Sequence, residues 1–236
     1  MTDVRKREIA LGGIWMLVEQ HPAVTHPLIK MLSRNPNDMH AWQTFARHHH
    51  WIVRTFPSHV YRLFQRLPLN QQVALFPVLS DEFPPGMVSI VDGEIVFAPG
   101  DPDFSAHAGL QLELCRSLGV GPAEVPLTGV GAFIHHHRVM AAEGPTDFML
   151  GVFGPGHEAA VPMMFRQLVS GAPPTVNPTY MFEHLTIDVE HAARFREVLV
   201  HGDIDLAAVR RGAMWSLDLR AAAWDDILHA IQATRP

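Results

Sequence analysis

Residues 181–195 read MFEHLTIDVEHAARF, and three side chains that can bind a metal recur along this segment. His184, Asp188 and His191 are separated by four and then three residues. Because an α-helix has about 3.6 residues per turn, this spacing places the three side chains on one narrow face. Most charged residues of the segment fall on the far side, as on an ordinary solvent-exposed face. The segment therefore predicts a helix that directs two imidazoles and one carboxylate towards the protein interior.

Buried groups of this kind need partners. An imidazole or carboxylate that is buried without a hydrogen bond or a bound cation destabilises the fold by several kcal/mol. A metal ion would satisfy all three groups at once. Hydrogen bonds from neighbouring helices would also satisfy them, so the spacing alone leaves both interpretations open.

A further candidate ligand, Glu158, lies in the segment HEAAVPMMF, which follows Pro155 and Gly156 and predicts a helix over residues 156–170. Pro162 comes four residues later and removes the backbone hydrogen bond to the carbonyl of residue 158, so a kink is expected there. Irregular helical geometry is common at functional sites. The alternative is that Glu158 is a carboxylate in the first helical turn, where the helix dipole favours it without any metal.

Two other segments could complete a metal site. The segment VLSDEFPPG, residues 78–86, contains Asp81 and Glu82, and a later amphipathic segment, residues 103–118, contains His107 near its start. One carboxylate and one histidine from this region would give three carboxylates and three imidazoles in all. Oxygen and imidazole donors without a thiolate suit iron or manganese better than a structural zinc ion.

Helical periodicity covers most of the chain. Predicted helices span residues 22–32, 38–56, 59–67, 103–118, 129–142, 146–153, 156–170, 178–201 and 221–234. Pro57 and Pro68 are expected to interrupt the helical pattern of the first third. Alternation of strands with helices, which would indicate a parallel sheet, is absent.

One segment lacks the helical pattern and has the residue pattern of β-strands. PPGMVSIVDGEIVFAPGD, residues 84–101, has two short β-branched runs joined by Asp92 and Gly93, a pair suited to a two-residue hairpin turn. With 236 residues, 47% of them hydrophobic, the chain is long enough for one sizeable core. We therefore expect a single all-α domain over residues 1–236, with a small β-hairpin inserted near residues 86–100.

The composition argues against several classes of partner. The chain has 18 Lys and Arg residues against 24 Asp and Glu residues and no basic block that could follow a phosphate backbone, so nucleic acid is not expected. No apolar run near the N-terminus is long enough for a secretory signal or a membrane span, and there is one cysteine. We expect a cytoplasmic protein that binds a small-molecule substrate and no membrane; a homodimer is left open.

Histidine is abundant, with 16 residues, and two runs of three occur at His48–His50 and His135–His137. The members of a run cannot all face one site, so at least one side chain of each is expected in solvent. Arg54, Arg138 and Arg194 could each bind an acidic substrate, although surface positions are the simpler interpretation.

Taken together, these residues resemble the haem-oxygenase-like di-iron oxidases and oxygenases. The last core helix of that family carries His-x3-Asp-x2-His, which matches His184, Asp188 and His191. Glu158 matches the glutamate of the family's central helix. The remaining matches are the Asp81-Glu82 pair, His107 at the start of a helix that ends in Leu118-Gly119, and the segments HPLIKML (26–32) and FARHHHWIVRTFPSHVYRLF (45–64). The resemblance spans about residues 21–200.

The resemblance implies a haem-oxygenase-like multi-helical bundle and an oxidoreductase that holds two Fe²⁺ ions per chain with O₂ as co-substrate. The metal ligands that it implies are Glu82, His107, Glu158, His184, Asp188 and His191. Asp81 is the substitute for Glu82, because the hairpin lengthens the gap to His107. The implied substrates are amino acids, fatty acids or amines, and the implied outcomes are desaturation, oxidative carbon–carbon cleavage or oxygenation.

The sequence departs from the family pattern at two places, and each departure argues against one kind of family member. No Asp or Glu occurs between Asp38 and Asp81, which argues against the seventh ligand of members that resemble N-oxygenases. Residue 157 is His and residues 156–170 contain no lysine, which argues against members that build p-aminobenzoate from their own side chain.

The alternatives are a metal-free enzyme of the same fold, resembling pyrroloquinoline-quinone synthase or thiaminase II, and a non-catalytic helical module. Thiaminase-like chemistry would need Cys115 as a nucleophile, yet Cys115 lies among Leu112, Leu114 and Leu118 and reads as a buried, inert thiol.

Overall fold

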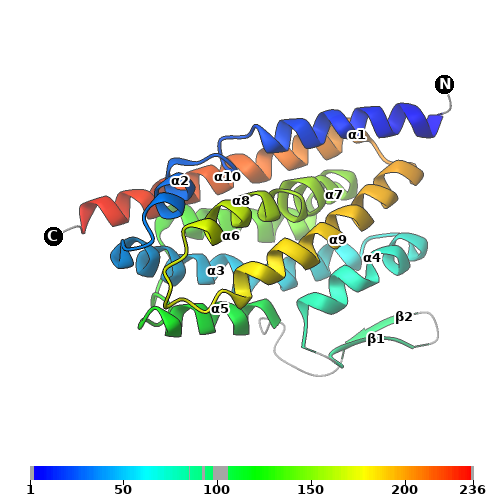
Figure 1. Ribbon diagram of the computed structural model, residues 1–236. Coiled ribbons are helices and arrows are strands. Elements are labelled where there is room, and N and C mark those ends of the chain that lie inside the picture. The colour runs from blue at the N-terminus through cyan, green and yellow to red at the C-terminus, as the bar shows by residue number, and fades with distance from the viewer. Residues whose placement is uncertain (1–2, 85, 92–93, 98–105, 235–236) are drawn as a thin grey trace.

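Helices form the body of the protein, as predicted (Figure 1). The computed structural model describes residues 3–84, 86–91, 94–97 and 106–234. Its α-helices are α1 (Asp3–Glu19), α2 (Pro27–Arg34), α3 (Met39–Phe64), α4 (Leu69–Glu82), α5 (Ala106–Ser117), α6 (Thr128–Glu143), α7 (Thr146–Phe153), α8 (Ala160–Ser170), α9 (Thr179–His201) and α10 (Leu206–Ala233), and a short π-helix (Gly154–Glu158) joins α7 to α8.

The helix α9 brings together segments that are far apart in the sequence. It packs against α8 and the π-helix on one side, and against α4 and α5 on the other. The helix α10 packs along α6 and α7, and α3 packs against α5 and α6. The interior face of α9 therefore meets side chains from four other segments.

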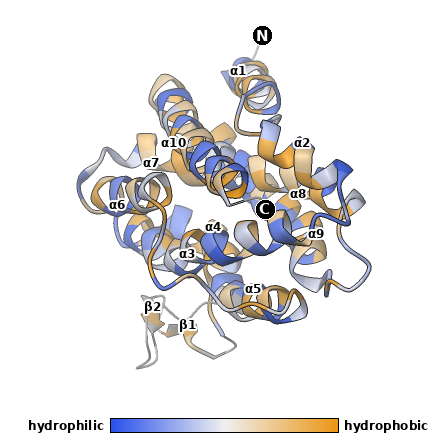
Figure 2. Cartoon of the chain, turned by 90° about the vertical axis from the view of Figure 1, so that its left-hand side faces the viewer, coloured by the Kyte–Doolittle hydropathy of each residue, from blue (hydrophilic) through white to orange (hydrophobic). Residues whose placement is uncertain are grey.

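Apolar side chains fill the space between the helices. Each long helix carries both apolar and polar positions, as the hydropathy colouring shows (Figure 2). Burial of the apolar face of amphipathic helices is the main force that holds such a bundle together. Among the largest fully buried side chains are Trp42 and Phe45 of α3, Phe195 of α9 and Trp224 of α10.

The predicted β-hairpin is present beside α4, at the edge of the bundle (Figure 1). Strand β1 (Val88–Val91) pairs antiparallel with β2 (Glu94–Phe97), with Val88 opposite Phe97 and Val91 opposite Glu94. The predicted turn residues Asp92 and Gly93 lie outside the described residues.

Three expectations about the helices were wrong. The helix α3 continues through Pro57, where a break was predicted, because Phe56, Val60 and Leu63 on the same helix are buried in the core and hold the chain in place. The helices α1 and α4 were not predicted at all. The last helix begins at Leu206 rather than at residue 221.

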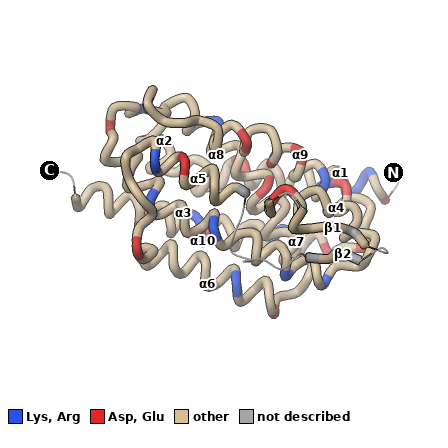
Figure 3. The backbone as a smooth tube through the Cα atoms, turned by 90° about the horizontal axis from the view of Figure 1, so that it is seen from below, with Lys and Arg blue, Asp and Glu red and all other residues tan. Residues whose placement is uncertain are grey.

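Charged residues are spread over the surface of the fold. In Figure 3, Lys and Arg positions are scattered among several helices and form no continuous stripe in the part of the chain that is drawn in colour. Within the described residues, none of the helices combines the length and the apolar character that a bilayer crossing would need.

Candidate metal centre

Glu158 is positioned by the π-helix. The amide of Ala159 donates to the carbonyl of Gly154 at 3.1 Å, a bond that skips one residue more than an α-helical bond does. Because α7, the π-helix and α8 follow one another without a break, Glu158 lies inside a continuous helical segment. The expected helix start at residue 156 was therefore wrong, and a dipole at a free helix N-terminus does not explain this buried carboxylate.

The helix α9 supplies three side chains at once. His184, Asp188 and His191 are all buried, so the predicted inward-facing stripe is confirmed as geometry. His184 Nδ1 donates to Asp188 Oδ2 at 2.7 Å, one helical turn away.

The ends of α4 and α5 face this stripe. Glu82 closes α4, His107 lies in the first turn of α5, and both are buried. Glu82 Oε1 lies 3.4 Å from His107 Nδ1. Asp81 takes a different position, because its side chain is 48% exposed and its Oδ2 accepts from His191 Nε2 at 3.1 Å. Of the two adjacent carboxylates, Glu82 is thus the one that points into the interior.

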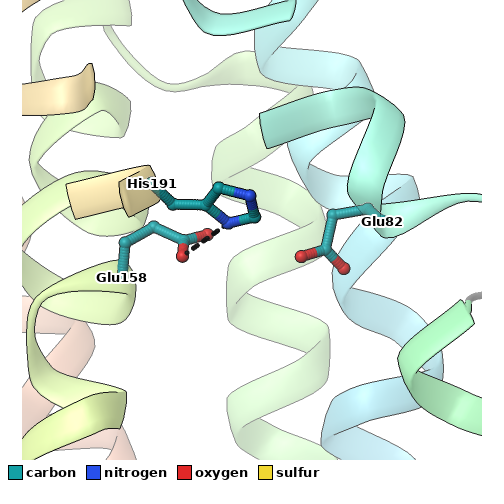
Figure 4. A group of neighbouring side chains, drawn as sticks. All are labelled: Glu82, Glu158 and His191. Atoms are coloured by element: carbon teal, nitrogen blue, oxygen red, sulfur yellow. Dashed lines mark hydrogen bonds and ion pairs between the residues drawn. The ribbon is translucent and has the colours of Figure 1, made fainter. Parts of the chain in front are cut away.

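Three of the side chains come close enough to share one cation. Glu82, Glu158 and His191 each offer a ligand atom, and these atoms all lie within 4.8 Å of one another. Figure 4 shows these side chains approaching one space from α4, the π-helix and α9. His191 Nδ1 donates to Glu158 Oε2 at 3.2 Å.

In the absence of a metal ion, the buried groups of the cluster have shifted pKa values. Burial raises the pKa of Glu158 to about 7 and the pKa of Asp188 to about 7. Burial alone would lower the pKa of His107, but the charge of Glu82 outweighs it and raises this pKa to about 9. Burial would raise the pKa of Glu82, but His107 outweighs it, and the net direction is downward. The carboxylates therefore need positive charge beside them.

Two buried atoms of the described candidate ligands have no hydrogen-bond partner. Glu158 Oε1 and His184 Nε2 are both inaccessible to solvent and accept or donate no hydrogen bond. Orphaned groups of this kind are rare in native proteins unless an ion or a water satisfies them. Three carboxylates and three imidazoles with no thiolate are a donor set that fits iron.

Five of the six candidate ligands line a small cavity of about 20 Å³: Glu82, His107, Glu158, His184 and Asp188. Apolar side chains complete part of its wall: Ile52, Val53, Phe56, Val161 and Phe165.

The sequence reasoning missed three polar side chains of this wall: His157, Tyr180 and Arg220. His49, from the first histidine run, also lines the cavity. Tyr180 Oη lies 2.9 Å from His49 Nε2. Arg54, Arg138 and Arg194, which were considered as anchors for an acidic substrate, are absent from the described lining.

The two histidine runs divide between core and solvent. His49 and His50 are buried, and His48 is half-buried. In the second run only His137 is buried, while His135 and His136 are exposed, as the helical spacing requires.

Solved structures with a similar fold include two TenA homologues. The one from Pyrococcus furiosus is 11% identical, with a TM-score of 0.63 over 96% of this chain and 100% of that chain. The one from Pseudomonas syringae pv. tomato is 11% identical, with a TM-score of 0.64 over 95% of this chain and 92% of that chain. A domain of unknown function with a haem-oxygenase-like fold from Shewanella denitrificans is 17% identical, with a TM-score of 0.60 over 98% of this chain and 94% of that chain. Identities this low establish a shared fold and say nothing about activity.

The sequence also matches a family as a whole. The model of a family described as iron-containing redox enzyme matches residues 43–221, a span that includes all six predicted ligands. No match was found among curated proteins. Because the match covers more than half of the chain, and because the bundle has the haem-oxygenase-like fold, the protein belongs to this family of iron-containing redox enzymes.

Proposed function

We propose that this protein is a non-haem di-iron oxidase or oxygenase that uses O₂ to oxidise a small organic molecule. The observation that carries the proposal is the meeting of three buried carboxylates and three buried imidazoles in one cluster. Glu82 lies near the middle of the cluster, since it contacts His107 and also comes within 4.8 Å of Glu158 and His191. A carboxylate in this position would help to hold a pair of metal ions.

The remaining candidate ligands fall into two groups by their contacts with one another. One group is Glu158 and His191; the other is His107, His184 and Asp188, in which the rings of His107 and His184 lie 5.0 Å apart. A pair of ferrous ions, when bound, would supply the electrons and the binding site that O₂ activation requires.

The surrounding residues have distinct roles in this proposal. Val53, Phe56 and Val161 exclude water from the reacting centre. Asp81 accepts a hydrogen bond from His191 Nε2 and so fixes the ring with Nδ1 towards Glu158. Amino acids, fatty acids and amines are the proposed substrates, with desaturation, carbon–carbon cleavage or oxygenation as the outcome; the ligands do not select among these reactions.

Iron quantitation on protein loaded without oxygen tests the proposal. We expect about two iron ions per chain, as in other two-metal sites. Replacement of the central carboxylate in Glu82→Gln should reduce the count to one or fewer, because the cluster would lose the carboxylate nearest to its other candidate ligands. Glu190→Gln, an exposed carboxylate on α9, is the matched control and should leave the count unchanged. No bound iron, or a count that ignores Glu82, would contradict the proposal.

Metal-free chemistry of the thiaminase II type is the competing possibility. Cys115 is buried, its Sγ donates to Gln111 Oε1 at 3.4 Å, and burial raises the pKa of the thiol to about 11. It is also absent from the described cavity lining. A thiol of this kind is a poor nucleophile, so a Cys115→Ala variant should keep any oxidase activity; loss of activity with an unchanged iron content would favour the competitor.

A further inference from the structure

Arg220 is the one Lys or Arg side chain among the described residues that line the cavity of the metal centre. It projects from α10 and is 1% exposed, although arginine is the most basic type of side chain. Burial lowers the pKa of Arg220 to about 10, so the guanidinium keeps its charge at neutral pH.

The contacts of Arg220 leave that charge without a directly paired carboxylate among the described residues, and Asp188 and Glu158 act on it only from a distance. Its Nη2 donates to His157 Nδ1 at 2.6 Å, and a histidine that accepts in this way is neutral. Its guanidinium carbon lies 5.1 Å from the ring centroid of Phe133 and 5.7 Å from that of Trp224. Its Nε is buried with no hydrogen-bond partner, and within the described part of the chain no carboxylate forms an ion pair with it.

Acidic residues of the same cavity form hydrogen bonds with histidines and not with Arg220. Asp188 pairs with His184, and Glu158 pairs with His191. Under the proposed function both carboxylates would bind iron, and the positive charge of the iron would balance their negative charges. A buried cation with no carboxylate in direct contact is unfavourable, so its retention beside a cavity points to an anion that arrives from outside.

We propose that Arg220 binds the carboxylate of the substrate and holds the substrate against the metal centre. A guanidinium offers a planar pair of N–H groups that match the two oxygens of a carboxylate. Ile52, Val53 and Phe165 form an apolar wall that suits a hydrocarbon chain attached to that carboxylate, and the cavity of about 20 Å³ would have to widen to admit the chain. This inference rests on the proposed function, and it selects an organic acid from the substrate classes and sets simple amines aside.

His157 has a supporting role in this arrangement. Its ring stacks on Phe56 at a centroid distance of 3.7 Å, so its orientation is fixed while its Nδ1 accepts from Arg220. It also directly precedes Glu158 on the π-helix. The π-helix thereby carries both one candidate metal ligand and the histidine that positions Arg220.

Titration calorimetry with three probes of equal length tests the proposal: hexanoate, hexan-1-ol and hexylamine. The probes are added under anaerobic conditions to iron-loaded protein and to protein from which a chelator has removed metal. We expect hexanoate to bind more tightly than both other probes in each form. Arg220→Gln should weaken hexanoate binding by about 30-fold or more, with the iron count unchanged, because a buried charged contact is lost. Arg194→Gln, an exposed arginine on α9, should change neither quantity.

A conservative variant protects the test against misfolding. Arg220→Lys keeps the charge but not the planar pair of donors, so hexanoate binding should weaken less than in Arg220→Gln, while circular dichroism stays that of the wild type. A wild-type protein that prefers hexan-1-ol or hexylamine overturns the proposal, whether or not the variants fold. Hexanoate binding that requires iron and ignores Arg220 also overturns it. Failure of the di-iron proposal would appear separately, as an absence of iron in the loaded wild-type protein.

Discussion

His191 lies between two carboxylates that differ in exposure. Its Nδ1 faces the buried Glu158, and its Nε2 faces the half-exposed Asp81. A histidine whose second nitrogen donates to a carboxylate is held in one orientation and is a stronger metal ligand. We expect Asp81→Ala to lower iron affinity by about 10- to 100-fold, as measured by competition with a chelator. Asp81→Asn, which keeps an acceptor, should recover part of this loss.

The control for this prediction is Glu190→Ala on the exposed face of α9. It should leave iron affinity unchanged. The melting temperature of metal-free Asp81→Ala should also stay close to that of the wild type, because half of the Asp81 side chain is in solvent. An iron affinity equal to that of the wild type would show that Asp81 does not orient His191.

Local spacing accounts for part of the site at the residue scale. The spacing of His184, Asp188 and His191 predicted their common face, and the resemblance added the other candidates, which the structure places around the same cavity; their role as ligands stays a prediction. Arg220 was missed because the last helix was expected to begin at residue 221. With the true start at Leu206, Arg220 falls on the buried face of α10 with Leu217 and Trp224, and that pattern would have drawn attention to it.

At the scale of elements, two glycines let α7 and α10 approach closely. A Cβ on Gly151 would overlap the carbonyl oxygen of Val209, and a Cβ on Gly212 would overlap that of Phe148. Gly151→Ala should therefore force the helices apart and lower the free energy of unfolding by about 3 kcal/mol, the upper end for overpacked cores. Urea denaturation measures this change.

The matched control is Gly12→Ala in α1, where no atom lies within 4 Å of the added Cβ. This substitution should raise the free energy of unfolding by about 0.5–1 kcal/mol, because alanine favours the helix. Because α7 leads directly into the π-helix that carries Glu158, Gly151→Ala should also weaken iron binding. Equal stabilities of Gly151→Ala and the wild type would refute the close packing of α7 on α10.

Helix type could be predicted from periodicity, but several helix boundaries could not. Pro57 is a local signal for a break, yet the packing of Phe56 and Leu63 in the core outweighs it. The helix α1 carries Gly12 and Gly13 at its centre and exposes Ile9, so its own sequence gives a weak amphipathic signal. Such elements are fixed by contacts with distant helices, and contacts of that kind are not visible in local sequence.

At the scale of the whole molecule, buried neutral histidines make the free energy of unfolding depend on pH. His137 of α6 donates from Nδ1 to the Phe133 carbonyl at 2.8 Å, and its Nε2 accepts from Ser216 of α10 at 2.9 Å. Burial lowers its pKa to about 3, and burial also lowers the pKa of His59 on α3 to about 4. The two rings lie 6.5 Å apart, at a point where three helices meet.

The sign of the pH effect follows from these shifts. In the unfolded chain both histidines bind a proton near pH 6.5, whereas in the folded protein they bind it only near pH 4 or below. The free energy of unfolding therefore has its full value above pH 6.5 and decreases as the pH falls towards 4, by up to about 1.4 kcal/mol per pH unit for each histidine.

His137→Gln can still donate and accept hydrogen bonds but does not titrate. It should lower the slope of the free energy of unfolding against pH by up to about 1.4 kcal/mol per pH unit. His229→Gln, at an exposed site on α10, should leave the slope unchanged. The measurement is urea denaturation of metal-free protein between pH 7.5 and pH 4.5, chosen so that loss of iron in acid does not contribute. If His137→Gln and the wild type have the same slope, His137 has the same pKa in the folded and unfolded protein and does not contribute to the pH dependence of stability.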